Sequence, residues 1–559
     1  GSKIGLILAM AGNAVGLGNF WRFPYVAASN GGGAFMIPYF FALIVIGIPV
    51  MLIEWSIGRY GGKHGHGTLG PMMYLQAKQA MSPKKAIIIG SLCGMIAFAV
   101  TILVNSYYNH IIGWSLGFAI HSLLGTYKSD PGAFFSAYVQ DPKMLVFWVI
   151  SLGILTTAVM KGIQDGIESW AKIMMPVLYV FGIILGIRAL TLGSPINPDW
   201  SSLKGLNFIW NPDFSQLSWS SAIAAAGQIF FTLSLGMGII QNYASYLKPD
   251  EDIITASVAT VSLNEFAEVI LGGTAVIPIA YAFLGPEGIK GSIGLAFMAL
   301  PNVFSTMTGG GIFGALWFLL LFFAGITSAI AMYNYLVALL EEDAGIDRKK
   351  GACIVFIGYL IVGAPIALES VLTKSANLMY FTEVDNWIGN YLLIVLGLIE
   401  IVVIGWCVKD SALEEMNKGG LWKIPKWFFR LFHQFLTPIT IITFLVFFTK
   451  DYWIQGNFKL VPSYVASTPE FIPWVNLGRA VVLIVLVVGF IQSYKSIKSK
   501  YTKEIENNTS AGLNETNITK NLTGDNTPEY KEEEISSFTT KIVTKDSSRQ
   551  KNISITCST

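Results

Sequence analysis

Charged residues are scarce in this chain: only 13% of its 559 residues are Asp, Glu, Lys or Arg, whereas 53% are hydrophobic. Soluble domains carry roughly a quarter charged residues, so the composition excludes that class. The net charge of +2 gives no reason to expect a nucleic-acid partner. The apolar content is sufficient for twelve spans of about 20 residues each. We therefore predict an all-α polytopic membrane protein embedded in a lipid bilayer.

Cysteine and histidine are also few, with four and five residues respectively. The scattered cysteines exclude a disulfide framework, and no group has the spacing of a metal cluster. The nearest histidine pair, His64 and His66, falls in a glycine-rich loop. No Ser, His and Asp grouping accompanies a predicted cavity, so we expect a protein that is not an enzyme. The cysteines are Cys93, Cys353, Cys407 and Cys557.

Long apolar segments are abundant instead, and each predicts one membrane span. In the first half they cover residues 4–29, 33–59, 86–120, 144–161, 167–190 and 219–247. In the second half they cover residues 252–283, 312–341, 351–372, 388–408, 428–449 and 472–494. Most loop lysines and arginines, such as Arg59, Lys84 and Arg348, follow even-numbered spans. The positive-inside rule therefore predicts that these connections and both termini are cytoplasmic.

The first span contains an interruption that reads GNAVGLGNFWRFP from Gly12 to Pro24. Glycine in a helix interior costs about 1 kcal/mol relative to alanine, so three glycines within seven residues favour local unwinding. Irregular backbone at membrane depth persists only inside protein or beside a polar cavity. Its freed C=O and N–H groups can bind a cation and a carboxylate. An alternative, a small-residue packing face through Gly12 and Gly16, does not explain Asn19 or Arg22.

The sixth span contains a second interruption, GQIFFTLSLGMG from Gly227 to Gly238. Two interrupted helices five spans apart predict two inverted five-helix repeats, spans 1–5 and 6–10, with unwound spans 1 and 6 and a site at the membrane midplane. The two halves share no visible sequence identity. This prediction therefore depends on the two breaks alone.

Polar side chains also occur in the seventh and eighth spans. Asn264, Glu265 and Glu268 lie in the seventh, where a carboxylate is costly and almost always faces a cavity or a partner. Thr327 and Ser328 are adjacent hydroxyls in the eighth span, and they could donate oxygens to a hard cation. The alternative is that these hydroxyls bond only to the preceding helical turn.

Two further positions bear on the same cavity. Tyr107 and Tyr108 lie in the third span, either in the cavity or as anchors at the membrane interface. Asp385 begins the tenth span, where it could pair with Arg22 on the outer side or be a solvated helix end.

The run GNAVGLGNFWRFP, followed by Asn30-Gly31-Gly32-Gly33-Ala34-Phe35 and Glu54-Trp55-Ser56-Ile57-Gly58-Arg59, closely resembles the neurotransmitter:sodium symporter family. The resemblance recurs in residues 228–236, 263–273 and 319–328 and extends from Ile4 to about Ile497. Within the family it is similar to a bacterial leucine-transporting member. It implies twelve helices, ten of them in two inverted repeats, and import of an amino acid or related small molecule coupled to sodium.

The resemblance implies two Na+ ions as cofactors. It places the first ion at the Ala14 carbonyl, Asn19, Thr232 and Asn264. It places the second at the carbonyls of Gly12, Val15 and Ala324 and the hydroxyls of Thr327 and Ser328. Both sets contain only oxygen ligands, which suits a hard cation.

The resemblance also places the substrate against the unwound backbone of the first span. The implied substrate-binding residues are Ala14, Gly16, Leu17, Gly18, Val104, Tyr108, Phe231, Thr232, Ser234, Met237, Ser328 and Met332. Tyr108 is expected to bond the substrate carboxylate, and Phe231 and Ser234 are expected to address its amino end. Val104, Met237, Ser328 and Met332 form the expected side-chain pocket. The expected outer gate consists of Arg22, Phe231 and Asp385.

Two positions refine the expected substrate and ions. Relatives that carry monoamines have an aspartate at the position matching Gly16, so glycine here favours a substrate with its own carboxylate. The pocket has no charged partner and contains adaptable methionines, so we expect a neutral, mainly apolar amino acid.

Glu268 matches a serine of chloride-dependent relatives, and we expect its carboxylate, beside Tyr39, Gln228 and Thr232, to substitute for chloride. The alternative for Glu268 is a hydrogen-bonding role in helix packing.

The chain departs from the family pattern at the inner gate. Relatives usually carry a basic latch residue before the first span, which Lys3 does not match. Tyr246 and Glu342 match the latch region but have no partner visible in the sequence. The loop between spans three and four has no cysteine pair, which favours a prokaryotic origin and hence the cell membrane.

The composition changes after Tyr494. We predict a transmembrane domain over residues 1–497 and a disordered cytoplasmic tail over residues 498–559, since the tail has too few apolar residues to form a core. Four N-x-[ST] sequons occur in the tail, and a cytoplasmic location would keep them unglycosylated. They begin at Asn508, Asn514, Asn517 and Asn521.

Two alternatives to symport remain open. An amino-acid sensor or receptor of transporter fold would bind its ligand without net flux and would be expected to have a damaged sodium site, whereas every matched ligand type is present here. A sodium-independent exchanger would lack the Thr327 and Ser328 pair or ignore sodium. The sequence also leaves open whether the protein forms a homodimer.

Overall fold

The computed structural model describes residues 3–289 and 295–522, and every regular element within these ranges is helical. Nine helical segments in these ranges are long and apolar enough to cross a membrane, and each coincides with a predicted span. They are Gly33–Lys63, Pro83–Leu124, Asp165–Leu190, Ile253–Glu287, Gly310–Ala344, Arg348–Thr373, Met379–Val408, Lys426–Ile454 and Pro469–Thr502. The predicted all-α membrane fold is confirmed.

Several of these segments contain π-helical turns, which divide them into shorter α-helices. The α-helices are α3 (Gly33–Ala42), α4 (Ile48–Lys63), α6 (Pro83–Leu124), α9 (Ser169–Leu190), α13 (Ile253–Glu265), α14 (Ile277–Gly288), α16 (Gly310–Ala344), α17 (Arg348–Thr373), α18 (Met379–Val384), α19 (Leu393–Val402), α21 (Lys426–Phe428), α22 (Thr437–Ile454) and α23 (Ile472–Leu522). π-helical turns are frequent at functional sites. One of them, Phe266–Val276, contains Glu268.

The three remaining predicted spans are not continuous long helices. Span four is α8 (Met144–Met160), which meets α7 (Pro131–Gln140) at a bend of 74°. Span one consists of α1 (Lys3–Ala14), the π-helical segment Gly18–Arg22 and α2 (Phe23–Ser29). Span six consists of α11 (Trp219–Thr232) and α12 (Ile239–Ala244). The structure therefore has both breaks where the glycine-rich runs predict them.

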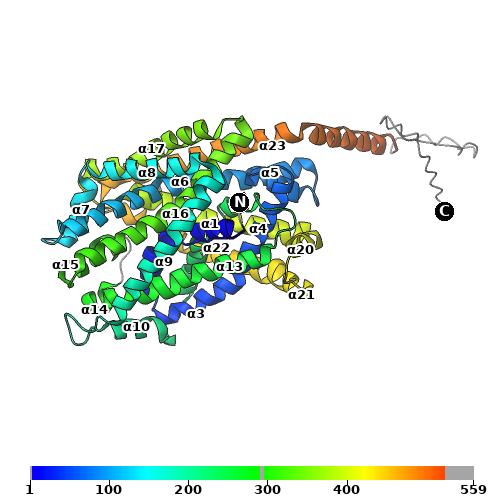
Figure 1. Ribbon diagram of the computed structural model, residues 1–559. Helices are drawn as coiled ribbons and strands as arrows, with labels where there is room; N and C mark the ends of the chain where they lie inside the picture. Colours follow the sequence, from blue (N-terminus) through cyan, green and yellow to red (C-terminus); the bar gives the residue numbers. More distant parts are fainter. Residues whose placement is uncertain (1–2, 290–294, 523–559) are drawn as a thin grey trace, which may run out of the picture. The chain divides into compact units, whose positions relative to one another are not determined.

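Helices α6 and α16 pack against each other along their length, and α1 lies beside α9, α13 and α16 (Figure 1). In the most apolar window of α16, 83% of residues are buried, against 28% for the segments of α22 and α23. Helix α16 is thus central, whereas α22 and α23 are peripheral. Peripheral helices expose large apolar side chains such as Ile361, Val446 and Ile484, as expected of surfaces that face lipid.

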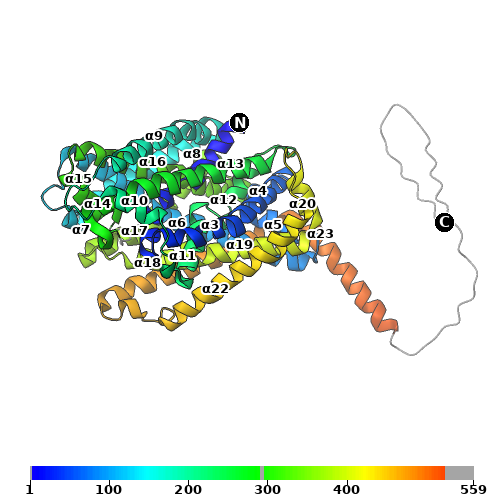
Figure 2. The ribbon, with the colours of Figure 1, turned by 90° about the horizontal axis from the view of Figure 1, so that it is seen from below.

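Several short helices lie at the two ends of the bundle. Figures 1 and 2 both show α5 (Leu69–Ala77) and α20 (Asp410–Asn417) at one end, and α7, α14 and α15 (Leu300–Thr306) at the other. The end with α5 and α20 holds connections that follow even-numbered spans, so it is the predicted cytoplasmic end. Helix α10 (Ser202–Trp210) belongs to the connection between α9 and α11.

The predicted boundary of the tail at residue 497 lies within α23. One compact unit extends over Gly1–Ile505, a second comprises Glu506–Thr559, and α23 continues as a helix to Leu522. Helix α23 therefore runs past residue 497 and past the change in composition, and the disordered tail stays a prediction. Residues 523–559, the side chains of the four sequon asparagines and the side chain of Lys3 lie outside the described residues.

Candidate functional site

The first break exposes backbone donors that side chains satisfy. Residues 15–17 lie between α1 and the π-helical segment that begins at Gly18. The Leu17 N–H donates to the Tyr108 hydroxyl oxygen of α6 at 2.7 Å, and the Gly16 N–H donates to Asn19 Oδ1 at 2.7 Å. These bonds satisfy two freed donors at membrane depth, where an unpaired N–H would cost several kcal/mol. Tyr108 therefore lies at the break and is not an interface anchor.

Any side chain at Gly16 would force two neighbouring hydroxyl groups to move. A Cβ atom there would lie 2.4 Å from Ser328 Oγ and 2.6 Å from the Tyr108 hydroxyl oxygen, both closer than real Cβ contacts. Glycine thus allows two polar side chains, from α16 and α6, to approach the unwound backbone.

The second break lies between Thr232 and Ile239. Ser234, Gly236 and Gly238 have φ angles of 56°, 68° and 79°, a region that favours glycine and is strained for serine. The Gly236 N–H donates to Glu54 Oε1 of α4 at 2.7 Å. The Ser234 hydroxyl donates to the Asn13 carbonyl at 3.2 Å. This last bond joins the two breaks directly.

A small cavity of about 20 Å³ lies between the two breaks. None of the side chains around it is charged. The lining residues are Asn13, Ala14, Gly16, Gly18, Val104, Tyr108, Phe231, Thr232, Ser234, Met237, Ile239, Ser328 and Met332. The structure thus brings together all the predicted substrate-binding residues except Leu17, which contributes its N–H bond to Tyr108. Asn13 and Ile239 are lining residues that the sequence interpretation did not include.

The five residues predicted for the second sodium ion form one cluster of oxygen atoms. The Thr327 hydroxyl lies 3.0 Å from the Ala324 carbonyl oxygen and 3.4 Å from that of Val15. The Ser328 hydroxyl lies 3.4 Å from the Gly12 carbonyl oxygen and also donates to Asn13 at 2.7 Å. Thr327 donates to Phe323 of the preceding turn as well. An oxygen-only set fits a hard cation such as Na+.

Three of the four residues predicted for the first sodium ion contact one another. Asn264 Oδ1 accepts from Asn19 Nδ2 at 2.8 Å and from the Thr232 hydroxyl at 3.4 Å. Ala14 is buried and lines the neighbouring cavity. In the described part of the chain, no group of three or more His, Cys, Asp and Glu side chains could hold a metal ion. The two oxygen clusters are the candidate cation sites.

The Glu268 side chain is fully buried beside the first cluster. Its Oε1 accepts from the Tyr39 hydroxyl and from Gln228 Nε2, each at 3.0 Å. Its Oε2 accepts from Asn19 Nδ2 at 3.0 Å and from the Thr232 hydroxyl. All four donors are neutral, and among the described residues no Lys, Arg or His contacts this carboxylate.

The outer gate differs from the prediction in one respect, because the described contacts include no direct ion pair between Arg22 and Asp385. Arg22 instead donates to Asn390 Oδ1 at 2.6 Å, and Asn390 Nδ2 donates to Asp385 Oδ2 at 3.0 Å. The Arg22 guanidinium lies 4.5 Å from the centre of the Phe231 ring. Tyr107 donates to Asp385 Oδ1 at 2.6 Å. The gate residues are therefore joined through an asparagine.

The sequence interpretation missed Asn390 as a gate residue. It lies five residues after Asp385 in the π-helical segment Asp385–Leu392, whose wider turn places residues five apart on one face. A helix of 3.6 residues per turn would have placed the two on different faces. The sequence thus offered no periodic signal that could have identified Asn390.

The structure identifies partners of Glu342 in the inner latch region that are not visible in the sequence. Its carboxylate accepts from the Gly67 N–H at 3.0 Å and from the Thr68 hydroxyl at 2.9 Å, and it lies 2.7 Å from Lys500 Nζ. These partners are distant in sequence, so neither pattern nor spacing could show them. Tyr246 lies near Asn334 and Asn242.

Comparison with known proteins gives matches to one family model, to individual relatives and to a solved structure. The sodium:neurotransmitter symporter family matches residues 1–129 and 138–498. An uncharacterized sodium-dependent transporter of Methanocaldococcus jannaschii is 33% identical over 519 residues, covering 89% of this chain and 98% of the relative. YhdH, an uncharacterized sodium-dependent transporter of Bacillus subtilis, is 32% identical over 453 residues, covering 79% and 95%. The crystal structure of MhsT in complex with L-phenylalanine matches with a TM-score of 0.69 at 32% identity, covering 80% of this chain and 98% of MhsT.

Proposed function

Because the chain belongs to the sodium:neurotransmitter symporter family, we propose that it is a sodium-coupled symporter that imports a neutral, mainly apolar amino acid by alternating access and without chloride. Its relatives are named sodium-dependent transporters, and MhsT was solved with a neutral apolar amino acid. The family consists of membrane transporters and not of enzymes, so the chain is embedded in a membrane.

The observation that carries the proposal is the uncharged cavity between the two helix breaks. The Tyr108 hydroxyl and the unwound backbone near Leu17 provide hydrogen bonds for a substrate carboxylate. Phe231 and Ser234 address the amino end, and Val104, Met237 and Met332 surround the substrate side chain. An amino acid is larger than the cavity of about 20 Å³, so binding has to move lining side chains. Met237 and Met332 are unbranched and adapt readily to such a change.

Two oxygen clusters beside this cavity support the coupling to two sodium ions. The first comprises Ala14, Asn19, Thr232 and Asn264, and the second comprises Gly12, Val15, Ala324, Thr327 and Ser328. Both take ligands from the broken first span, so cation binding and substrate binding order the same backbone. The buried Glu268 carboxylate supplies the negative charge that offsets the cations, which is why we propose independence from chloride.

The outer gate closes over this site in the proposed cycle. Phe231 covers the cavity, and Arg22 connects it through Asn390 to Asp385. We place the protein in the cell membrane with both termini in the cytoplasm, in accord with the distribution of loop lysines and arginines.

The decisive experiment is uptake of radiolabelled leucine into proteoliposomes under an inward sodium gradient, with potassium in place of sodium as the comparison. We expect sodium-dependent accumulation, and we expect Asn19→Ala to reduce it by up to about 100-fold, since leaving buried partners unsatisfied costs up to about 3 kcal/mol. Asn302→Ala is the matched control, because Asn302 is exposed and donates only to its own helix.

The same vesicles test the substrate class and the alternatives. Leucine and methionine should be accumulated, whereas lysine and glutamate should not. Strong uptake of either charged amino acid would contradict the apolar assignment. Sodium-dependent binding without accumulation would instead indicate a sensor, and uptake unaffected by replacing sodium would indicate an exchanger.

A further inference from the structure

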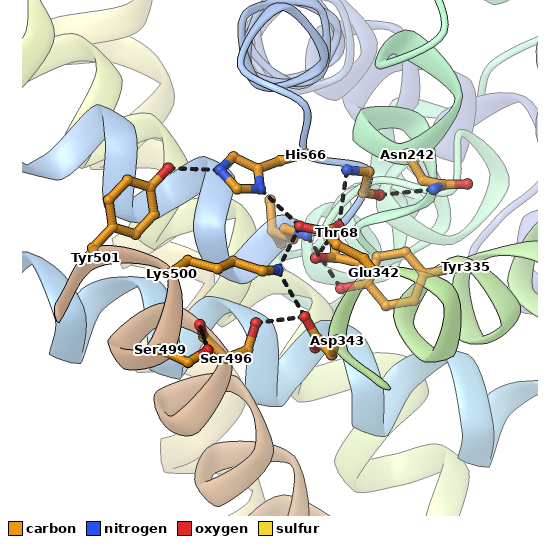
Figure 3. A network of polar contacts seen from close by, with 12 residues as sticks. His66, Thr68, Asn242, Tyr335, Glu342, Asp343, Ser496, Ser499, Lys500 and Tyr501 are labelled. Atoms are coloured by element: carbon orange, nitrogen blue, oxygen red, sulfur yellow. Dashed lines mark hydrogen bonds and ion pairs between the residues drawn. The ribbon is translucent and has the colours of Figure 1, made fainter. Parts of the chain in front are cut away.

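A second polar cluster lies at the predicted cytoplasmic end, around the carboxylate of Glu342 (Figure 3). Its Oε1 lies 2.7 Å from both His66 Nδ1 and Lys500 Nζ. Its Oε2 accepts from the Gly67 N–H at 3.0 Å and from the Thr68 hydroxyl at 2.9 Å. One carboxylate at the end of α16 thus holds the loop between α4 and α5 and also a residue of α23.

Helix α23 contacts this cluster through several residues. Lys500 Nζ lies 2.8 Å from Asp343 Oδ1, and Ser496 and Gln492 also donate to the Asp343 carboxylate. The Tyr501 hydroxyl oxygen lies 2.6 Å from His66 Nε2. Lys500 and Tyr501 therefore orient the acid and the imidazole that face each other across the cluster.

Residues 497–504 of α23 are docked on α5 and the residue that follows it. The Tyr501 and Tyr74 rings lie 4.6 Å apart, and Lys78 pairs with Glu504 at 3.0 Å. Ile497 is fully buried, and α23 bends at Tyr501, where φ is −122° and ψ is 21°. This part of α23 is thus fixed to α5, so Lys500 and Tyr501 are held in place at the cluster.

The loop also connects to the second broken span. The Gly67 carbonyl accepts from Asn242 Nδ2 of α12 at 2.7 Å. Asn242 Oδ1 in turn accepts from Asn334 Nδ2 of α16 at 2.7 Å. Asn334, Ala338 and Glu342 are four residues apart and therefore lie on one face of α16. If α12 and the loop move away from this face of α16, the bond between Asn334 and Asn242 and the bond between the Gly67 N–H and Glu342 have to break.

We propose that Lys500 and Tyr501 are positioning residues of the inner gate, which hold Glu342 and His66 against the loop of residues 66–68 and so keep the cytoplasmic path closed. This inference rests on the proposed alternating-access function. Opening toward the cytoplasm parts α12 and the loop from α16, and the fixed carboxylate opposes this step. Removal of the Lys500 ammonium leaves the Glu342 carboxylate less firmly held, so the inward-open state gains population.

The test measures thiol accessibility on both sides of the full-length protein. Ala338→Cys places a reporter between Asn334 and Glu342, where the side chain is 6% exposed. Ala224→Cys places an outer reporter one turn from Gly227, whose carbonyl accepts from Arg22. Each reporter is made in a background that carries Cys353→Ala, Cys407→Ala and Cys557→Ala, and labelling by a methanethiosulfonate reagent is timed in detergent.

We expect Lys500→Ala to accelerate labelling of Cys at position 338 by about fivefold and to slow labelling at position 224, in line with a population shift. Lys500→Arg should restore both rates, since it keeps the charge. Lys498→Ala, which removes an exposed lysine two residues away, should change neither. Unchanged labelling at position 338, or faster labelling at both positions, would overturn the proposal. Labelling does not require flux, so absent leucine uptake would count against the proposed function alone.

Discussion

Two glutamates illustrate how differently this protein balances a carboxylate in two places. Glu268 lies between the helix breaks and is bonded by four neutral groups, from Tyr39, Gln228, Asn19 and Thr232. Glu342 lies at the predicted cytoplasmic end, where it has a lysine within 2.7 Å and remains 13% exposed. The chain thus provides a cation for the second carboxylate and, among the described residues, none for the first.

The difference has a physical meaning for transport. A buried carboxylate is costly without a compensating charge, and neutral hydrogen bonds offset only part of that cost. Asn19 and Thr232 contact Glu268 and also belong to the proposed first sodium site. A sodium ion bound there would provide the missing positive charge, so Glu268 favours occupancy by a mobile cation. Glu342 already has its cation and therefore serves to hold helices together.

The largest expected effect on transport comes from removing the Glu268 carboxylate. Glu268→Ser removes the negative charge that offsets sodium, so uptake in gluconate medium should fall by at least about 30-fold, given that charge interactions at this depth amount to several kcal/mol. Chloride should restore uptake in this variant, whereas wild-type uptake should be equal in chloride and gluconate. Glu414→Ser, at an exposed position, is the matched control. Wild-type uptake that collapses without chloride would refute the assignment.

An intermediate effect is expected at the other glutamate. Glu342→Gln weakens the pairing with Lys500 but leaves the sodium sites intact, so labelling of the Ala338→Cys reporter should accelerate about fivefold. The sodium concentration for half-maximal leucine uptake should change by less than about threefold, through population shift alone. Chloride should have no influence on this variant. If the sodium requirement changed as much as in Glu268→Ser, the contrast between the two carboxylates would be lost.

The smallest expected effect concerns ionic strength. Lys500 is 22% exposed, so its ion pairs with Glu342 and Asp343 are partly screened by salt. Raising potassium chloride from about 0.1 to 0.5 M should accelerate labelling at position 338 about twofold, since the Debye length then falls to about 4 Å. The same change in salt should leave the labelling rate of the Ala338→Cys reporter nearly constant in the protein that also carries Lys500→Ala. Equal acceleration in both proteins would show that salt acts elsewhere.

The positions that sequence interpretation placed well are those where local chemistry is sufficient. Gly12, Gly16 and Gly18 disfavour a continuous helix wherever they occur, so the first break could be predicted from residue type. The substrate-binding residues taken from the family resemblance, except Leu17, line the cavity in the structure. The bridging role of Asn390 could not be foreseen, because it depends on a π-helical turn that changes which residues share a face.

The sequence by itself determined the membrane class, the spans and the two interruptions, because hydrophobicity and glycine content act on short stretches of chain. Only the tertiary structure decided that Glu342 has partners and that α23 belongs to the folded unit beyond residue 497. Lys500 and Glu342 are separated by more than a hundred residues, and nothing in either local stretch identifies the other. Contacts of this kind follow from how the helices pack, which no single segment encodes.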